Sequence, residues 1–352
     1  MRWTKHRLGL TLLACIFGYP VFADDYDDYG APESEQYQPD KASEIASITT
    51  DRGIVTRPGK LTVEPAFSHA YSNSTVVAIE GYTVIPALVV GLINITEVQR
   101  DIFIAALSLK YGISSRLETG LRIPYLSIQE DHRERQAFQG TPLDNLRESD
   151  GEGLGDVEWN LRYQFNDGLA GWPYVIGNFL VRAPTGENPY EVDRRELLDD
   201  QGNVVGIVLA ERPTGSGFWS FEPGLSFIYP SDPAVLFGNV SYGYTLKDDK
   251  GPENGGTINP GNVTRFGFGM GFAFNERTSF SLGYDHSVIP KTSLETGDNL
   301  TDTQFDRIQI GSLSFGLSQQ FSRSTSMNLT VSIGVTEQAP NSEISVKFPL
   351  TF

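Results

Sequence analysis

The sequence predicts an all-β protein, a single antiparallel up-and-down β-barrel of about 12 strands over residues 61–352. Three observations support this fold. Apolar and polar residues alternate with a period of two in segment after segment, which gives each strand one apolar and one polar face. Short and long connections between these segments alternate, and the chain ends on an alternating strand, 344–352, whose last residue is Phe352.

Residues 1–23 have the layout of a secretory signal peptide. Three basic residues within the first seven positions are followed by an apolar run over 8–17, and the small residue Ala23 precedes an acidic stretch. We therefore expect an exported chain, cleaved after Ala23. The single cysteine, Cys15, lies inside this segment. A lipoprotein signal is the alternative, weakened by the short apolar run before Cys15.

Residues 24–60 differ in composition from the rest of the chain. They are acidic, contain Pro, Ser and Gln, and have little apolar content, which is typical of a disordered tail. We expect a mostly disordered periplasmic segment. Whether part of it folds back into the barrel opening as a plug stays open at this stage.

The overall charge limits the partners of the chain. The formal net charge is -17, whereas a nucleic-acid-binding protein needs a basic surface. After the signal peptide, the sequence contains no run of about 18 apolar residues, the length that a transmembrane helix requires. Insertion into a membrane would therefore have to use strands.

The period-two segments from residue 61 onward give 12 strands. We expect them at 61–72, 100–113, 116–127, 154–166, 172–184, 217–229, 234–246, 263–274, 277–289, 306–321, 324–336 and 343–352. The segment 73–99 is also apolar in part, and it either extends the first two strands as one tall hairpin or adds a pair and makes 14. Within 306–321, Ile308 and Ile310 are out of phase with Leu313, which suggests a β-bulge.

The connections predict how the strands cross the membrane. Those near 112–116, 166–171, 230–233, 274–277 and 321–324 are short, whereas those near 127–153, 185–216, 247–261 and 290–305 are long. Outer-membrane barrels have short periplasmic turns and long extracellular loops, and an even strand number places both termini in the periplasm. The pattern therefore predicts a barrel of the bacterial outer membrane, in contact with lipid and assembled through the strand that ends at Phe352.

The distribution of charge decides which face of the barrel is wet. The polar face carries many charged residues that a soluble core could not bury without great cost, whereas a wet lumen can hold them. The predicted lumen-lining residues are Glu64, Lys110, Glu118, Arg122, Asp156, Glu158, Arg162, Glu222, Arg265, Asp285 and Lys347. Their charges nearly balance, which favours cross-lumen salt bridges and a narrow or gated pore, or a passage for uncharged solutes, over a strongly selective ion pore.

The sequence nominates no catalytic, cofactor-binding or metal-ligating residue. It contains no G-x-S-x-G, H-E-x-x-H or P-loop motif. The glycine-rich stretch 151–156 precedes a predicted strand and not a helix, which excludes a dinucleotide-binding turn. We therefore expect a protein that is not an enzyme.

Several motifs resemble a known family. Gly-Leu-Gly-Asp at 153–156 enters the strand 157–163, and Ala-Pro-Thr-Gly follows at 183–186; further matches lie at 53–65, 217–223, 229–233 and 275–279. Together they resemble the outer-membrane transporters of the MetA-pathway of phenol degradation family, over nearly all of 53–352. The resemblance implies a β-barrel that transports small solutes, hydrophobic or aromatic ones among them.

A second class of function stays open. The long loops at 127–153 and 185–216 could be the working surface of a structural or surface-interaction barrel. The functional-amyloid secretion pores have a similar barrel, but this chain lacks the long N-terminal coiled coil that those pores carry.

Overall fold

The computed structural model describes residues 55–80, 92–136, 144–168, 171–189, 192–198, 204–249, 256–290, 293–296 and 307–352. The predicted signal peptide and residues 24–54 of the acidic segment lie outside these residues. In the part of the chain that is described, no helix is long and apolar enough to cross a membrane.

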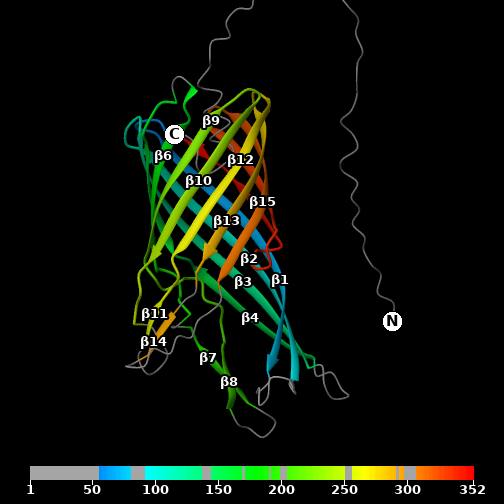
Figure 1. Ribbon diagram of the computed structural model, residues 1–352. Coiled ribbons are helices and arrows are strands. Elements are labelled where there is room, and N and C mark those ends of the chain that lie inside the picture. Colours follow the sequence, from blue (N-terminus) through cyan, green and yellow to red (C-terminus); the bar gives the residue numbers. More distant parts are fainter. Residues whose placement is uncertain are drawn as a thin grey trace, which may run out of the picture. The chain divides into compact units, whose positions relative to one another are not determined.

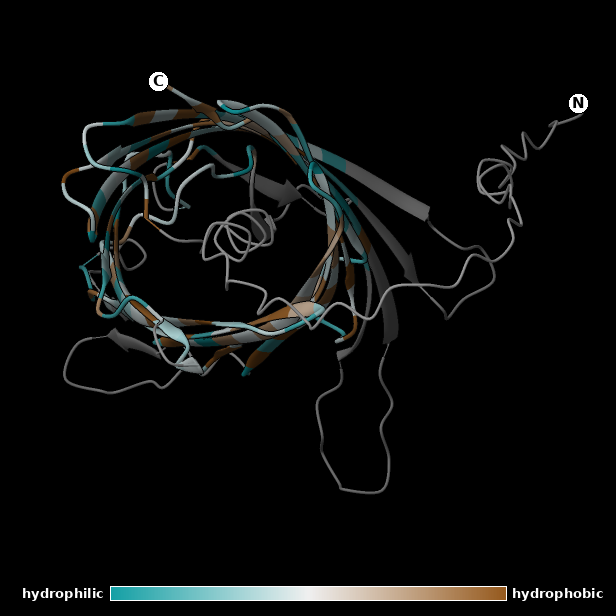
Figure 2. Cartoon of the chain, turned by 90° about the horizontal axis from the view of Figure 1, so that it is seen from above, coloured by the Kyte–Doolittle hydropathy of each residue, from teal (hydrophilic) through white to brown (hydrophobic). Residues whose placement is uncertain are grey.

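The described strands close into one antiparallel barrel of 12 strands. Figure 1 shows them running obliquely around the barrel, and Figure 2 shows the ring seen along its axis. Two of the 12 are each interrupted once, β4 with β5 and β17 with β18. The barrel strands are β1 (Leu61–Glu80), β2 (Leu92–Gly112), β3 (Leu117–Gln136), β4 (Asp144–Leu154), β5 (Val157–Gln164), β6 (Tyr174–Ala183), β9 (Ser220–Pro230), β10 (Ala234–Thr245), β12 (Val263–Asn275), β13 (Thr278–Ile289), β15 (Ile308–Ser322), β16 (Thr325–Gly334), β17 (Ser342–Lys347) and β18 (Leu350–Thr351).

The last strand closes the barrel against the first. β17 pairs antiparallel with β1 from Ala66↔Lys347 onward, and β18 continues the same register at Val63↔Leu350. The backbone N–H of Phe352 donates to the carbonyl of Leu61 over 2.9 Å. Closure between the final strand and the strand that begins at Leu61, as predicted, is confirmed.

The first strands are taller than the alternation predicted. β1 and β2 pair without interruption as far as Glu80↔Leu92, so residues 73–80 and 92–99 extend the first two strands as one tall pair and the 14-strand alternative is wrong. The expected loop 127–153 is also wrong in part, because β3 continues to Gln136 and β4 begins at Asp144. The extensions at 128–136 and 144–152 are rich in charged residues. Their sequences lack a regular alternation of apolar and polar residues, so the period-two signal ends there.

The β-bulge predicted near Ile308 and Ile310 is absent from β15, and a bulge occurs elsewhere in the barrel. β15 pairs with β13 in one register from Thr278↔Gln319 to Ile289↔Ile308, so no bulge separates Ile308 from the residues that follow. Ile308 and Ile310 instead lie on the lumen side of the strand. A bulge occurs at 155–156, between β4 and β5, because Tyr125 opposes Leu154 whereas Arg122 opposes Glu158, one residue out of step.

The two ends of the barrel differ. One end, called here the turn end, carries the short connections 113–116, 165–173, 231–233, 276–277 and 323–324 together with Phe352. The other, called the loop end, carries the long connections and two small sheets, β7 (Arg194–Leu198) with β8 (Val204–Leu209) and β11 (Gly256–Asn259) with β14 (Ser293–Thr296). The predicted alternation of short and long connections holds only in part, because the loop-end connections 137–143 and 335–341 are shorter than the turn-end connection 165–173.

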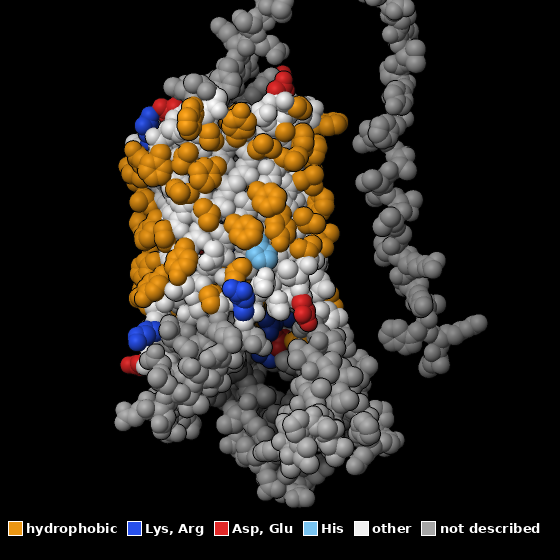
Figure 3. All heavy atoms as spheres, viewed as in Figure 1, with side chains coloured by type: hydrophobic (Ala, Val, Ile, Leu, Met, Phe, Trp, Pro, Cys, Tyr) orange, Lys and Arg blue, Asp and Glu red, His pale blue; other side chains and the backbone are white. Residues whose placement is uncertain are grey.

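The outward face of the barrel is apolar. Large hydrophobic side chains are exposed along every second position of the strands, and Figure 3 shows them as a broad belt with charged side chains near its edges. Examples are Phe67, Trp159, Phe268 and Phe315, of which Phe67 and Phe268 are each 58% exposed. Exposed apolar surface of this extent marks contact with a membrane or another apolar partner.

Candidate functional site

The lumen contains a cavity of about 520 Å³. Its walls come from β1, β2, β3, β5, β6, β9, β10, β16 and β17, so it lies inside the ring of strands and not between elements on the outer surface. Strands alternate inward and outward positions, and the polar positions point inward here. The cavity is the candidate functional site.

The structure brings together eight of the eleven lumen residues nominated from the sequence. Those that line the cavity are Glu64, Lys110, Glu118, Arg122, Glu158, Arg162, Glu222 and Lys347. The other three lie beside it. Arg265 forms an ion pair with Glu222, Asp285 lies against Gly267 and Asn239 on the inner wall, and Asp156 lies at the bulge near the loop end.

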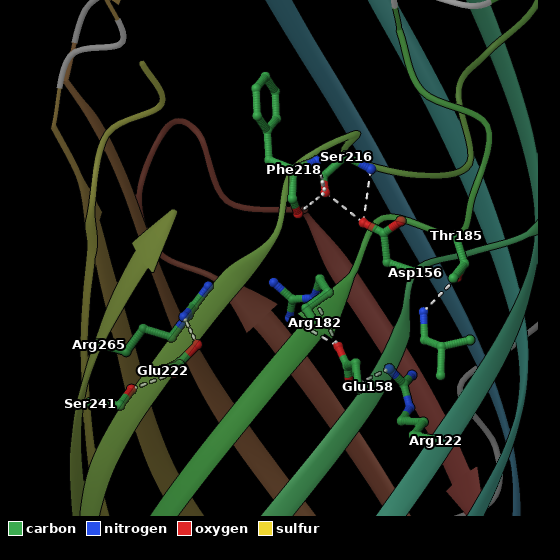
Figure 4. A network of polar contacts seen from close by, with 11 residues as sticks. Arg122, Asp156, Glu158, Arg182, Thr185, Ser216, Phe218, Glu222, Ser241 and Arg265 are labelled. Carbon is green, nitrogen blue, oxygen red and sulfur yellow. Dashed lines mark hydrogen bonds and ion pairs between the residues drawn. The ribbon is translucent and has the colours of Figure 1, made fainter. Parts of the chain in front are cut away.

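The charged residues pair along the wall and not across the lumen. Arg122 Nη1 lies 3.3 Å from Glu158 Oε2, and Arg182 Nη2 lies 2.9 Å from Glu158 Oε1. Both arginines are register neighbours of Glu158, on the two adjacent strands. Figure 4 shows Glu158 between them. Residues directly opposite on adjacent strands are close enough to pair in this way, whereas salt bridges across the lumen stay a prediction.

The same arrangement recurs around the cavity. Lys110 Nζ lies 3.1 Å from Glu64 Oε2, between β2 and β1. Arg162 Nη1 lies 3.1 Å from Glu118 Oε1, between β5 and β3. Both of these pairs join adjacent strands along the wall, and all four residues line the cavity.

Glu222 is held by two partners from neighbouring strands. Ser241 Oγ on β10 donates to Glu222 Oε1 over 2.6 Å, and Arg265 on β12 forms an ion pair with Glu222 Oε2. Figure 4 shows this group on the wall beside the Glu158 group. The two groups together hold three arginines and two glutamates in one layer of the lumen.

A further ionic group lies nearer the loop end. Glu130 on β3 is 1% exposed and binds two arginines, Arg100 of β2 and Arg212. Arg212 belongs to the connection between β6 and β9, and its Nη2 lies 2.6 Å from Glu130 Oε1. Its Nε donates to Ser149 Oγ of β4 over 2.8 Å. Part of the β6–β9 connection is thereby fastened to the inner wall of the tall strands.

Asp156 fastens the two ends of the same connection. Its Oδ1 accepts the N–H of Gly186 over 3.2 Å, and its Oδ2 accepts the N–H and hydroxyl of Ser216 over 2.9 and 2.6 Å. Gly186 and Gly215 lie so close that a Cβ on either would meet the backbone of the other. Asp156 is therefore a structural anchor of the connection, whereas the sequence placed it with the lumen lining.

The chain enters the barrel from the lumen side at the turn end. The N–H of Thr56 donates to Glu118 Oε2 over 2.5 Å, and the N–H of Gly59 donates to the carbonyl of Gly112 over 2.8 Å. A Cβ at Gly112 would collide with the carbonyl oxygens of Thr56 and Arg57, so glycine permits this close approach. Residues 24–54, the rest of the segment considered as a plug, lie outside the described residues.

The wall formed by β12, β13, β15 and β16 differs from the charged wall. Many of its inward positions carry glycine, serine or threonine, including Gly267, Gly269, Ser281, Gly316, Ser318 and Thr330. These positions alternate with exposed outward residues such as Phe268, Leu282 and Phe315. Apart from Arg265 of β12 and Asp285 of β13, the described inward residues on this side of the lumen are therefore mostly small or uncharged.

Apolar side chains lie in the lumen on both sides of the charged layer. Near the turn end, Tyr174, Ile176, Ile228 and Val235 form a buried cluster on β6, β9 and β10, with Phe237 packed against it. Nearer the loop end, Ile104 and Leu126 oppose each other on β2 and β3, and Ile128 follows, 8% exposed. In both zones, apolar side chains occupy inward positions, where the alternation predicts polar ones.

Four charged lumen residues escaped the sequence analysis besides Glu130, namely Arg100, Arg182, Arg212 and Glu343. Arg100 and Glu130 belong to stretches where the alternation is weak, and Arg212 was assigned to a loop. Glu343 shares a predicted strand and its inward phase with Lys347, so counting from Lys347 would have found it, whereas Arg182 lies on the predicted strand 172–184, for which no lumen residue was nominated. Among the described residues, no group of three or more His, Cys, Asp or Glu could hold a metal ion.

Comparison with known proteins supports the fold. No family model matches the chain, so membership of the phenol-degradation family stays a prediction. An outer-membrane channel from Pseudomonas putida F1 has a TM-score of 0.53 and 12% identity, over 85% of this chain and 97% of that one. The toluene transporter TodX of Pseudomonas putida has a TM-score of 0.42 and 9% identity, over 84% and 89% of the two chains. The β domain of the Bordetella autotransporter BrkA has a TM-score of 0.42 and 11% identity, over 84% and 100%. At these identities, the first likeness shows the outer-membrane barrel fold alone, and the other two, below 0.5, add no argument.

Proposed function

We propose that the protein is an outer-membrane channel for small solutes. The observation that carries this proposal is the 520 Å³ cavity, enclosed by a polar inner wall within a barrel whose outer surface is apolar. Water-filled space inside a closed barrel with lipid-facing apolar residues is the architecture of a membrane passage. No catalytic role is required of the lumen residues.

The exterior supports placement in the outer membrane. The apolar belt offers the lipid contact that exposed residues such as Phe67 and Phe315 need. Export through the signal peptide, with cleavage after Ala23, and assembly by the barrel-assembly machinery through the strand that ends at Phe352 complete this proposal. The turn end would face the periplasm and the loop end the outside.

The lumen supports small solutes, hydrophobic or aromatic ones among them. The cavity that the ion pairs line measures about 520 Å³, a volume that suits small molecules. The apolar zones around Ile176 and Leu126 on either side of the charged layer can contact the rings or chains of such solutes. The resemblance to phenol-degradation transporters points to the same class.

Planar-bilayer recording of the purified full-length protein tests the channel proposal. We expect discrete conductance steps, because ions can pass through a lumen that is lined by polar and charged side chains. Residues 24–54 precede Thr56, which is anchored in the lumen, so the recording is repeated on a variant that lacks them. The absence of conductance in both proteins would refute the proposal.

A structural or surface-interaction barrel, or a secretion pore, is the second candidate. The observation that favours it is the size of the loop end, where β1–β4 extend beyond the barrel and β7–β8 form a separate hairpin. Replacing residues 194–209, which span that hairpin, by a short Gly-Ser linker should then abolish binding to a surface partner and leave conductance unchanged. Unchanged partner binding after this replacement argues against the second candidate.

A further inference from the structure

The lumen ion pairs expose their basic partners more than their acidic ones. Glu130 is 1% exposed, whereas its partner Arg100 is 44% exposed. Glu158 is 16% exposed, whereas Arg122 and Arg182 are 36% and 30% exposed. Each of the other ion pairs described in the lumen shows the same order. A solute in the lumen therefore meets guanidinium and ammonium groups before it meets carboxylates.

Two features explain why the basic residues are more exposed than the acidic ones: the lengths of the side chains and the number of arginines that bind each glutamate. A glutamate side chain is shorter than an arginine side chain, so the carboxylate stays near the wall while the planar guanidinium extends over it toward the axis. Two glutamates, Glu130 and Glu158, each bind two arginines. In the Glu158 group, Arg122 and Arg182 share a single carboxylate.

The acidic residues outside these pairs do not cancel the effect around Glu158. Both oxygens of Asp156 accept hydrogen bonds from Gly186 and Ser216 of the β6–β9 connection. Asp285 lies on the inner wall against Gly267, and Glu343 lines the cavity from β17, the strand that also carries Lys347. Neither Asp285 nor Glu343 adjoins Glu158 on its own or the adjacent strands.

The wall opposite the arginines leaves room for a solute. Gly316, Ser318 and Thr330 occupy inward positions there, and Thr330 lines the cavity. The cavity of about 520 Å³, lined by both Thr330 and Arg122, is large enough for a molecule of the size of a substituted benzene. A guanidinium binds a carboxylate through two parallel hydrogen bonds and stacks on aromatic rings.

From this exposure order we propose that the channel prefers small organic anions, in particular aliphatic and aromatic carboxylates, over cations and over uncharged analogues of the same size. This inference rests on the proposed channel function and names its solute class. The carboxylate of the solute passes along Arg182, Arg122 and Arg265, and its carbon skeleton passes along the glycine–serine wall. We expect this preference to be moderate for two reasons. The total charge of the lumen residues is nearly balanced, and solvent and salt screen exposed ion pairs.

The test is the zero-current potential of the full-length channel in a tenfold KCl gradient. We expect the sign of this potential to show that chloride permeates more readily than potassium. The double variant R122Q/R182Q should lose roughly threefold in the permeability ratio of chloride to potassium, the range expected for exposed charges. R116Q is the matched control, because Arg116 pairs with Asp167 in the connections at the turn end and does not line the cavity. The variant R122K/R182K keeps the charge and should keep the preference for chloride.

Block of the KCl current in the same bilayer recordings tests which class of solute the channel prefers. Benzoate should reduce the KCl current at a lower concentration than benzyl alcohol, and R122K/R182K should weaken this difference because lysine lacks the planar fork. Preference for potassium, or equal effects of benzoate and benzyl alcohol on a conducting channel, would overturn the inference and leave the channel proposal standing. If R122Q/R182Q does not fold, R265Q carries the same test. The absence of any conductance would instead refute the channel proposal itself.

Discussion

Replacement of Asp156 by alanine should release the β6–β9 connection from the barrel wall. The carboxylate accepts three hydrogen bonds, at 3.2, 2.9 and 2.6 Å, and the residue is 9% exposed. Hydrogen bonds to a charged group contribute about 1.5–3 kcal/mol each in favourable cases. Because the bonds share one carboxylate and the Gly186 bond is long, we expect a combined loss of about 3 kcal/mol.

The loss has a direct consequence for local opening. A decrease of about 3 kcal/mol in the opening free energy raises the opening constant by roughly 100-fold. The backbone amides of Gly186 and Ser216, which donate to Asp156, should exchange hydrogen for deuterium up to that much faster. Exchange measured by mass spectrometry on peptides that cover 184–189 and 211–218 reports this change.

Two variants control the experiment. Asp156→Asn keeps one accepting oxygen and should give an intermediate acceleration. Glu211→Ala removes an exposed acid from the same connection and should leave the exchange of both peptides unchanged. If Asp156→Ala exchanges at the wild-type rate in both peptides, Asp156 does not hold the connection and the anchor interpretation is wrong.

Three further predictions follow from the wall, its closure and the entry of the chain. Thr330→Trp places a large ring in the cavity and should lower single-channel conductance by about half or more, because the ring fills a large share of a cavity of this size. Ile333→Trp, on the outward face of the same strand, is the matched control. Equal conductance in the two variants would contradict the inward orientation of Thr330. Deletion of Phe352 removes the backbone bond to Leu61 and should lower the yield of heat-modifiable folded barrel while the conductance of the assembled fraction stays unchanged; a normal yield would argue against its role in closure. Deletion of residues 24–54 should raise conductance if that segment enters the lumen ahead of Thr56, and unchanged conductance would exclude a plug.

Most of the barrel could be predicted from the alternation of residues. Where one face meets apolar surroundings and the other meets water, as around Phe268 and Leu282, the period of two is strong and the strand limits agree within a few residues. Beyond the apolar belt, the sequences of 128–136 and 144–152 are mostly polar and lack the alternation. Their pairing depends on backbone hydrogen bonds and on register, which leave no periodic signal in the sequence.

The lumen was less predictable than the wall. Alternation alone indicated that Glu158 and Arg162 point inward, but it could not show that Glu158 binds two arginines from adjacent strands. The one-residue bulge at 155–156 shifts the phase between β4 and β5, so the orientation of Asp156 could not follow from counting. The balance of acidic and basic residues also concealed their unequal exposure, because a count of charges contains no information on side-chain reach.

Swelling of proteoliposomes tests the central claim, a passage through the lumen, most directly. The full-length protein is reconstituted, and the vesicles are transferred to isosmotic solutions of a pentose or of a larger trisaccharide. The enclosed cavity lined by Glu158, Arg162 and Thr330 predicts faster swelling in the pentose than in the trisaccharide, and slower pentose entry for Thr330→Trp. Vesicles with the wild-type protein that swell no faster than protein-free vesicles, with or without residues 24–54, would contradict the account.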